Sequence, residues 1–315
     1  MYDSDASPGT HHVNDRRWPT RITVASANFT TVPRRKSASV DKLIEVMGDA
    51  AHRGADLIVF PELAINSWGR CADCADAHRP CDWHLEEAET ADGPSAARIA
   101  EAAAAADIHV IYGFEERGDT PGVIHNSANL IGPAGRIGTY RKLHLGIPLE
   151  TDRFTPGNSL PVFDTALGPI GISICYDFYN NPELSRLLCL KGARLLVNPT
   201  GRSDLPHARE NLTQATLVRA QENLVYAVSS NRVGATHGGS PWAGGSVIGG
   251  PDFPGFGLAL ATAGPDEELI VAELDFDRLA RWHDWLPWTR WRLDEQRPVT
   301  ELVQREFAAL LDGSR

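Results

Sequence analysis

A thiol, a carboxylate and an ammonium group stand where apolar segments of the sequence end. Cys175 closes the apolar segment 170–175, Glu62 follows the segment 55–60 after one proline, and Lys142 ends a further strand candidate. In α/β proteins, chemistry is usually placed where strands end and lead into helices. A thiol there can face a pocket together with neighbouring backbone N–H groups, which suits a nucleophile with an oxyanion site. A lone cysteine is more often a small buried hydrophobe, so Cys175 alone does not indicate catalysis.

The elements that must position these groups alternate between strands and helices. Apolar runs and period-two alternation predict strands over 21–28, 55–60, 108–114, 124–131, 136–142, 170–175, 194–198 and 224–231. Helical periodicity predicts helices over 40–52, 95–106, 182–191 and 206–223. Turn residues between the fourth and fifth of these strands indicate a hairpin. This order favours a layered α/β protein in which two sheets stack face to face.

The composition excludes several classes of protein. The 30 Lys and Arg residues against 41 Asp and Glu residues give a net charge of −11, which argues against a nucleic-acid partner. With 42% hydrophobic residues, the 315-residue chain can bury a substantial core. No apolar run approaches the ~18 to 20 residues of a membrane span, and the amino terminus lacks an export signal. We therefore expect a soluble, cytoplasmic protein with neither a nucleic-acid nor a membrane partner.

The chain is expected to form one folded domain between two terminal segments. Residues 1–20 mix Ser, Asp, Pro, Gly and His without an apolar period, which predicts a flexible tail. The domain is expected over residues 21–280. The extension 281–315 begins with four tryptophans, Trp282, Trp285, Trp288 and Trp291. Because large rings need burial, this extension is predicted to lie at a subunit interface.

Three separated blocks of the sequence resemble the nitrilase superfamily of carbon–nitrogen hydrolases. Residues 60–63 (Phe-Pro-Glu-Leu) are similar to its glutamate block, residues 140–145 to its lysine block and residues 171–177 to its cysteine block. The segments 113–115, 126–128, 219–223 and 231–234 are also similar, and the resemblance spans residues 21–295. One such block is a weak signal, but their occurrence in the family's order is a strong one.

The resemblance implies a fold and a set of catalytic roles. The fold is a four-layer αββα sandwich, commonly assembled into dimers or larger oligomers. The roles are general base for Glu62, nucleophile for Cys175 and stabilisation of the oxyanion for Lys142, helped by the backbone N–H of Tyr176. Physical chemistry supports these roles, because a base creates the thiolate and an ammonium lowers the energy of a developing oxygen charge.

A second glutamate and a set of pocket residues complete the predicted site. Glu150 stands six residues before a Pro-Gly pair, as in amidase members of the family, and is assigned to hold Lys142 and to orient substrate or water. Residues predicted to bind substrate are Tyr176, Trp68, Phe178, Asn198 and Thr200. No cofactor and no metal are expected.

The resemblance favours hydrolysis of a non-peptide C–N bond in a small amide or N-carbamoyl compound. Ammonia would be released through a thioester on Cys175. The pair Tyr176-Asp177 is similar to the amidase and carbamoylase branches, whereas nitrile hydrolysers tend to carry Trp-Glu there. Phe178 and Tyr179 stand where carboxylate-binding members carry arginines, which predicts an aromatic wall. The expected partners are a small amide or ureido substrate and further copies of the chain, as a homodimer or larger homo-oligomer.

Several alternatives remain open at this point. Nitrile hydrolysis and acyl transfer would use the same three groups. A non-catalytic binding protein on this fold would account for the extra residue between Cys175 and Pro182, relative to the usual pattern. His144 lies on the same strand face as Lys142 and could activate the thiol, although a hydrogen-bonded structural place is favoured.

Four of the remaining residues have a spacing that suits a metal. Cys71, Cys74, Cys81 and His84 form Cys-x2-Cys-x6-Cys-x2-His, which could place three sulfurs and an imidazole around zinc. No hairpin signature frames them, so packing or solvent-facing thiols are favoured over a metal site. Cys189 is expected to pack on a helix. The five cysteines, an odd number without an export signal, are predicted to be free thiols.

Overall fold

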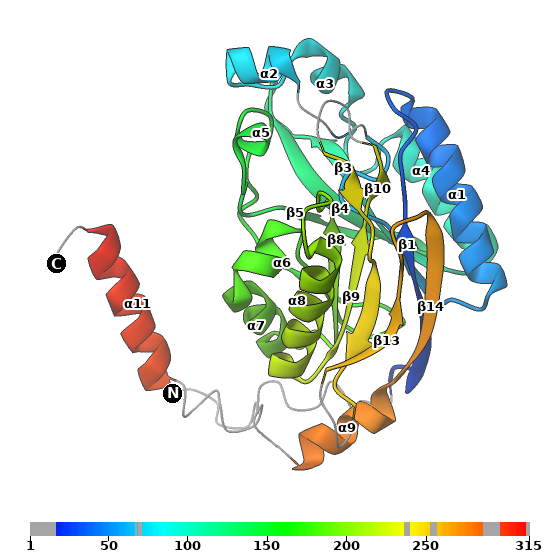
Figure 1. Ribbon diagram of the computed structural model, residues 1–315, viewed down its shortest axis with the longest axis vertical. Coiled ribbons are helices and arrows are strands. Elements are labelled where there is room, and N and C mark those ends of the chain that lie inside the picture. The colour runs from blue at the N-terminus through cyan, green and yellow to red at the C-terminus, as the bar shows by residue number, and fades with distance from the viewer. Residues whose placement is uncertain are drawn as a thin grey trace.

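Two stacked sheets form the centre of the molecule (Figure 1). The computed structural model describes residues 17–66, 68, 71–235, 240–252, 257–285 and 297–312. The first six-stranded sheet has the order β14 (Glu268–Asp275), β1 (Arg21–Asn28), β2 (Leu57–Val59), β3 (His109–Arg117), β4 (Ile124–Gly132), β5 (Gly135–Arg141). The second six-stranded sheet has the order β13 (Leu258–Thr262), β12 (Val247–Gly250), β9 (Tyr226–Asn231), β8 (Leu195–Thr200), β7 (Ile170–Ile172), β6 (Val162–Phe163).

Each sheet has a parallel centre and antiparallel edges. Strands β1, β2 and β3 are parallel, as are β7, β8 and β9, whereas β14, β4 and β5 in the first sheet and β6, β12 and β13 in the second pair antiparallel. The chain after each parallel strand therefore emerges at one edge of its sheet. A short ribbon, β10 (Val233–Gly234) with β11 (Trp242–Ala243), follows β9.

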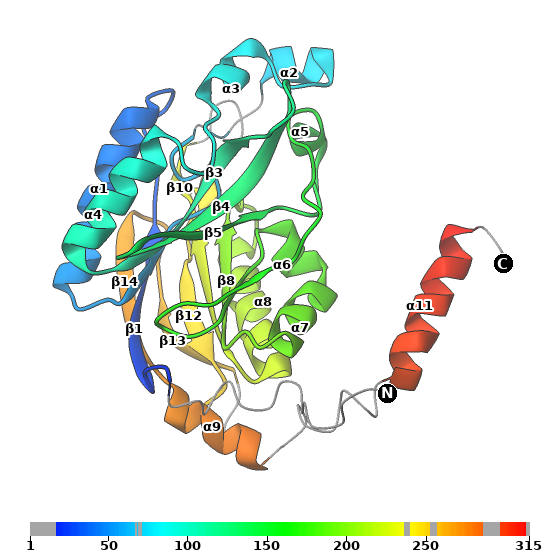
Figure 2. The ribbon, with the colours of Figure 1, turned by 180° about the vertical axis from the view of Figure 1, so that it is seen from behind.

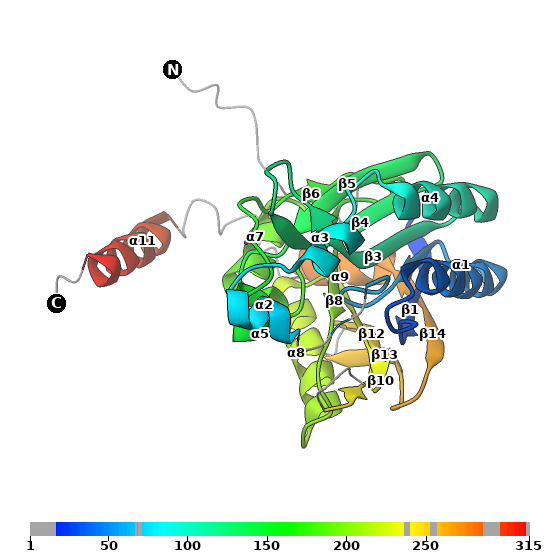
Figure 3. The same cartoon turned by 90° about the horizontal axis from the view of Figure 1, so that it is seen from above.

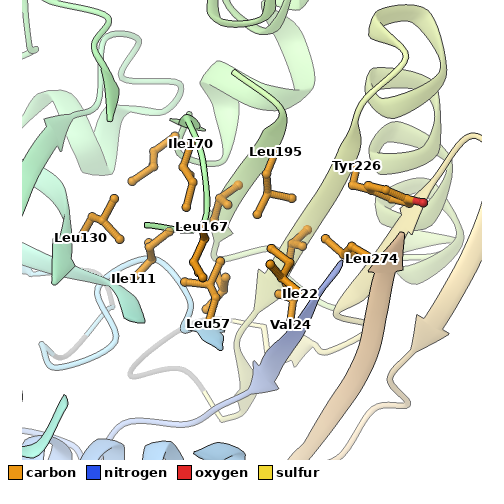
Figure 4. Packing of buried hydrophobic residues seen from close by; sticks show 14 of the residues in the cluster. Ile22, Val24, Leu57, Ile111, Leu130, Leu167, Ile170, Leu195, Tyr226 and Leu274 are labelled. Atoms are coloured by element: carbon orange, nitrogen blue, oxygen red, sulfur yellow. The ribbon is translucent and has the colours of Figure 1, made fainter. Parts of the chain in front are cut away.

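The apolar core between the sheets takes one face from each of them (Figure 4). The first sheet contributes Ile22, Val24, Leu57, Ile111 and Leu130, and the second contributes Ile170, Leu195 and Tyr226 with their neighbours. These side chains are almost fully buried. Because alternate residues of a strand point to opposite faces, the next residue in each strand faces the outer layer.

Helices cover both outer faces of the sheet pair. Helices α1 (Lys36–His52) and α4 (Pro94–Ala106) lie side by side on the first sheet (Figure 2). Helices α7 (Pro182–Leu190) and α8 (Ala208–Asn223) cover the second sheet, beside the short α6 (Tyr176–Asn180). Seen from above, the helix, sheet, sheet and helix layers follow one another (Figure 3). The predicted αββα sandwich is confirmed.

Short helices gather at one end of the sandwich. Helices α2 (Ala72–Ala77), α3 (Asp82–Glu87) and α5 (Pro148–Thr151) lie at the end opposite α9 (Phe276–Trp285) (Figure 1). The first three are not predicted from the sequence, because each is six residues or shorter and carries little apolar periodicity.

The predicted boundaries differ from the observed ones at both the starts and the ends of elements. The strand at 21–28 is confirmed without change. Helix α1 begins at Lys36, four residues before the predicted start, because Ser39 bonds the backbone N–H of Val32 and joins the helix to the preceding loop. Strand β3 runs to Arg117, because its pairing with β4 continues beyond the apolar run.

The terminal segments fall partly outside the described residues. Residues 1–16 of the predicted tail lie there, as do Trp288 and Trp291. Trp282 is buried beside Leu224, whereas Trp285 is largely exposed. Helix α11 (Arg297–Leu311) stands apart from the sandwich (Figure 1). Within the described part of the chain, no helix combines the length and the apolar character needed to span a bilayer.

Candidate active site

Cys175 occupies a strained turn directly after β7. Its backbone has φ 49° and ψ −103°, and it immediately precedes α6. Its N–H donates to Oδ1 of Asn198 at 2.9 Å and to the carbonyl of Pro199 at 3.1 Å, both at the end of β8. A non-glycine residue in such a conformation costs about 1–3 kcal/mol and persists only where its surroundings enforce it. The turn leaves the Cys175 side chain partly exposed, as a nucleophile requires.

Glu62 is held by a second strained turn, after β2. Leu63 has φ 50°, and a Cβ atom on Gly113 would come within 2.3 Å of its backbone nitrogen, so only glycine fits at that place on β3. Nη1 of Arg232 donates to the carbonyl oxygens of Glu62 and Leu63 at 3.0 and 2.7 Å. The Glu62 side chain is almost fully buried and its Oε2 faces Gly201 at the end of β8.

Lys142 and Glu150 meet Glu62 in one buried network. Nζ of Lys142 lies 2.9 Å from Oε1 of Glu62 and 2.5 Å from Oε1 of Glu150. Nδ2 of Asn126, on β4, donates to the same two oxygens at 2.7 and 3.3 Å. The second oxygen of Glu150 accepts the Gly146 N–H at 2.9 Å. Two carboxylates around one ammonium leave one negative charge unbalanced, so this network can accept a proton.

The electrostatics of the site link the thiol to this network. Burial, and next the negative charge of Glu62, raise the pKa of Cys175 to about 12, although Lys142 opposes the shift. Burial acts to lower the pKa of Lys142, but the charges of Glu62, Cys175 and Glu150 outweigh it and hold that pKa above its ordinary value. Burial also raises the pKa of Glu150. The resting site therefore holds a neutral thiol beside a charged ammonium.

Asp177 ties the lysine segment to the cysteine turn. Its carboxylate accepts the Tyr140 hydroxyl at 2.6 Å, the backbone N–H groups of Leu143 and His144 at 2.9 Å, and Nδ1 of His144 at 2.8 Å. Asp177 is fully buried. His144 is thus engaged by a carboxylate two residues beyond the nucleophile, which agrees with the favoured structural place.

The predicted pocket residues have different surroundings. Tyr176 is 37% exposed and follows Cys175 directly. Asn198 is fully buried, and its Nδ2 donates to Ser229 Oγ at 2.9 Å, so it positions the Cys175 turn. Thr200 is also buried and accepts the Tyr179 hydroxyl at 3.1 Å. A hydrogen bond from Thr200 is among the contacts that lower the pKa of the thiol against the larger effect of burial.

Phe178 requires a correction. Its side chain is fully buried in the apolar cluster between the second sheet and α7 and α8, with Leu188, Leu196 and Ala220. It therefore packs behind the sheet instead of lining the cleft. The next residue, Tyr179, instead donates its hydroxyl to Oγ1 of Thr200 at 3.1 Å.

Trp68 is buried beside the turn that follows Glu62. It is 9% exposed and packs with Leu63, Phe154 and Trp242. Its ring is stacked on Phe154 with centroids 6.4 Å apart. Contact of Trp68 with substrate stays a prediction.

Three residues that position the site are not predicted from the sequence. Asn126 and Arg232 lie in segments that resemble the family, yet neither carries a chemical signature, because an amide or a guanidinium is ordinary in a strand end. Asp177 was noted only as the partner of Tyr176. A buried arginine requires hydrogen-bond acceptors, so knowledge of its burial would have indicated a structural role for Arg232. The sequence does not show which arginines are buried.

A second group of side chains converges near this end of the molecule. The ligand atoms of Cys71, Cys74, Cys81 and His84 all lie within 4.8 Å of one another. We call these four residues the Cys–His cluster, and Glu62, Lys142, Glu150 and Cys175, which are predicted to be catalytic, the catalytic cluster. The sequence alone favours packing or solvent-facing thiols in this segment, and that interpretation does not account for the convergence.

Comparisons with known proteins identify the family of the chain. Residues 23–284 match the family model of carbon-nitrogen hydrolases. An (R)-stereoselective amidase from Pseudomonas sp. is 37% identical over 227 residues, covering 71% of this chain and 74% of that protein. A nitrilase from Pyrococcus abyssi is 33% identical over 249 residues, covering 77% and 84%. Among solved structures, Saccharomyces cerevisiae Nit3 of the nitrilase superfamily has a TM-score of 0.76 at 23% identity, covering 88% of this chain and 98% of that one.

Proposed function

Because the chain belongs to the carbon–nitrogen hydrolase family within the nitrilase superfamily, we propose that this enzyme hydrolyses the C–N bond of a small amide or N-carbamoyl compound through a Cys175 thioester. The observation that carries the proposal is the convergence of Glu62, Lys142 and Glu150 on the strained Cys175 turn. A binding protein that retained the thiol for packing would not need a strained, partly exposed cysteine beside a buried ammonium.

In the first half of the reaction, the Cys175 thiol loses its proton at the same time as its sulfur attacks the carbonyl carbon. Since the pKa of Cys175 is about 12, the proton leaves to Glu62 while sulfur bonds to the carbonyl carbon. That proton cancels the unbalanced negative charge of the network. The Lys142 ammonium and the N–H of Tyr176, which is the first amide of α6 and has no intrahelical partner, stabilise the oxyanion.

In the second half the same carboxyl group returns the proton. Collapse of the tetrahedral intermediate breaks the C–N bond, and Glu62 protonates the leaving nitrogen, so ammonia departs and a thioester remains. Glu62 then accepts a proton from water as the water attacks the thioester. Collapse of this second tetrahedral intermediate breaks the C–S bond, and Glu62 returns the proton to sulfur, so the products are the carboxylic acid and the free thiol. Glu150 stays bound to Lys142 and the Gly146 N–H throughout, so we assign it to positioning the ammonium.

Amides are favoured among the possible substrates. Three of the similar proteins are an (R)-stereoselective amidase, an omega-amidase from Xenopus tropicalis that is 28% identical over 275 residues, and a nitrilase. Nitrile hydrolysis and acyl transfer would require the same three groups.

The test is ammonia release from a panel of aliphatic amides, aromatic amides, N-carbamoyl amines and nitriles. Wild-type protein is compared with Cys175→Ala and with Cys189→Ala, a matched variant that removes a partly exposed thiol on α7. Release that disappears only in Cys175→Ala supports the proposal, and the active compounds identify the substrate class. A Cys175→Ala variant that keeps wild-type rates would contradict it. Analysis of the acyl product separates acyl transfer from hydrolysis, because hydrolysis yields the free carboxylic acid whereas transfer to an added amine yields a new amide.

We also propose that copies of the chain associate through α11. Its residues Leu302, Val303, Phe307 and Leu310 are between 44% and 62% exposed and recur at helical spacing along one side. Sedimentation velocity of a Val303→Glu/Phe307→Glu variant, with Gln304→Glu as the control that adds charge elsewhere on the helix, would test this. Equal sedimentation of both variants and wild type would contradict the proposal. The cytoplasmic location stays a prediction.

A further inference from the structure

The Cys–His cluster has the composition and connection of a closed metal site. Its three cysteines and one histidine lie within residues 71–84, on and just before the short helices α2 and α3. Cys71 and Cys81 immediately precede these helices, whereas Cys74 and His84 lie in their interiors. Four protein ligands of this kind fill the coordination of a tetrahedral Zn²⁺ and leave no open position, which is the arrangement of a structural site.

The distances fit such a site. Zn–S bonds of ~2.3 Å at tetrahedral angles place two sulfurs about 3.8 Å apart. Sγ of Cys71 and Sγ of Cys81 are 3.7 Å apart. All four ligand atoms lie within 4.8 Å, about 1 Å beyond the ideal separation, a difference that side-chain rotation can remove. Two sulfurs in a disulfide are ~2.05 Å apart, so the sulfurs are spaced as metal ligands and not as a covalent pair.

One backbone amide is directed at the sulfurs. The N–H of Cys81 donates to Sγ of Cys74 at 3.2 Å. A dication placed between three such sulfurs would deprotonate them outright.

The histidine is oriented for ligation by a buried carboxylate. Nδ1 of His84 lies 3.0 Å from Oε2 of Glu115 on β3, and both side chains are almost completely buried. This contact leaves Nε2 as the nitrogen for a metal. Glu115 is itself held by Nη1 of Arg153 at 3.2 Å. A carboxylate that fixes the second nitrogen of a ligating histidine is the usual outer contact of a protein zinc site.

We propose that Cys71, Cys74, Cys81 and His84 bind one structural Zn²⁺ ion. The ion would join α2 and α3 to each other and, through His84 and Glu115, to strand β3 of the first sheet. A second contact, between Nδ1 of His78 and Asp152 at 2.9 Å, joins the end of α2 to the segment after Glu150. The metal would therefore fix the segment 71–84, which lies beside α5 at one end of the catalytic cluster. The metal itself would take no part in bond breaking. This inference does not depend on the proposed reaction.

The experiment measures metal binding by the full chain under reducing conditions. Protein freed of metal by a chelator is titrated with Co²⁺ and with Zn²⁺, and metal content is determined by mass spectrometry after gel filtration. We expect one ion per chain. Co²⁺ should give a thiolate-to-metal charge-transfer band and strong visible bands of tetrahedral cobalt, both abolished by an equivalent of Zn²⁺.

Two variants, X-ray absorption and intact-mass analysis distinguish the possible outcomes. The Cys71→Ser/Cys81→Ser variant should lose the ion, whereas Cys189→Ser should retain it. If the double variant does not fold, X-ray absorption on the wild-type zinc protein gives the ligands directly, and three sulfurs at about 2.3 Å with one nitrogen at about 2.0 Å are expected. Absence of stoichiometric binding, an ion held by oxygen ligands only, or intact-mass evidence of a Cys71–Cys81 disulfide in freshly purified reduced protein would overturn the proposal.

Discussion

The catalytic cluster and the Cys–His cluster are built in opposite ways. The four residues of the first come from the chain after β2, after β5, in α5 and after β7, and so require both sheets. The four residues of the second lie within residues 71–84, outside the sheets, and only His84 reaches a strand, through Glu115. The first should fail when any part of the sandwich shifts, whereas the second can be lost or filled with the sandwich intact.

The cysteines of the two clusters also have different surroundings. Cys175 is fixed by its backbone, which is strained and bonded to Asn198 and Pro199, and its pKa is raised to about 12. The sulfurs of the Cys–His cluster are gathered around a common centre. In the proposed reaction one thiol stays neutral until a base acts on it, whereas a zinc ion needs several thiols that ionise together.

The largest expected effect is on catalysis by Cys175→Ala. Amide hydrolysis should fall by about 10⁴-fold or more, because the covalent intermediate cannot form. Metal content should remain at the wild-type value. The measurements are ammonia release and metal analysis on the same preparation. Loss of metal together with activity would show that the two clusters are not independent.

The next effect concerns the pH dependence of the Cys175 thiol. Below a pKa of about 12 the thiolate fraction rises tenfold per pH unit, so alkylation by iodoacetamide should rise about 10³-fold between pH 7 and pH 10. Glu62→Gln removes a charge that raises this pKa, so the variant should be alkylated faster and yet hydrolyse amides more slowly. Peptide mass spectrometry isolates the Cys175 rate from that of Cys189. Slower alkylation of Glu62→Gln would mean that Glu62 deprotonates the resting thiol.

A smaller effect is expected from Glu115→Gln. Replacing the carboxylate that orients His84 should weaken zinc binding about 10- to 100-fold. The rate of amide hydrolysis should change little, because the Glu115 carboxylate contacts His84 and Arg153, and neither belongs to the catalytic cluster. Competition with a chromophoric chelator gives the affinity. Unchanged affinity would remove Glu115 from the outer contacts of the proposed site.

The smallest expected effect is on stability, from Gly113→Ala. The added methyl group would lie 2.3 Å from the Leu63 nitrogen, and forcing it in should lower the free energy of unfolding by about 1–3 kcal/mol and displace Glu62. Gly48→Ala, in α1 with open space around it, should raise the free energy of unfolding by about 0.5–1 kcal/mol. Urea denaturation compares the two. A neutral Gly113→Ala variant with full activity would show that the Glu62 turn tolerates movement.

The sequence predicted much of the fold and four site residues for a simple reason. Strand ends are marked by the change from apolar to polar residues, so Glu62, Lys142 and Cys175 could be placed at strand ends before their partners were known. Glu150 was found from its distance to a Pro-Gly pair. The structure brings Glu62 and Glu150 onto Lys142, with Cys175 close enough to alter its pKa.

Other features required three-dimensional neighbours. Phe178 was expected in the cleft because it is aromatic and near the nucleophile, but the direction of a side chain in α6 depends on how that helix leaves the strained turn. Asn126 and Arg232 were given no role because their bonds are to residues 64 and 170 positions away. Sequence periodicity is local and carries no information on such contacts.

By itself, the sequence determined the order of strands and helices, their stacking into layers and the chemical types available at the strand ends. These follow from local apolar periodicity and from turn residues. Only the tertiary structure decided that Glu62 and Glu150 share one ammonium, that Cys175 is held in a strained turn by Asn198, and that the Cys–His cluster converges beside Glu115. Those outcomes depend on the packing of segments that are distant in the chain. Burial shifts the pKa values of the side chains brought together there, and their hydrogen-bond partners fix their orientation.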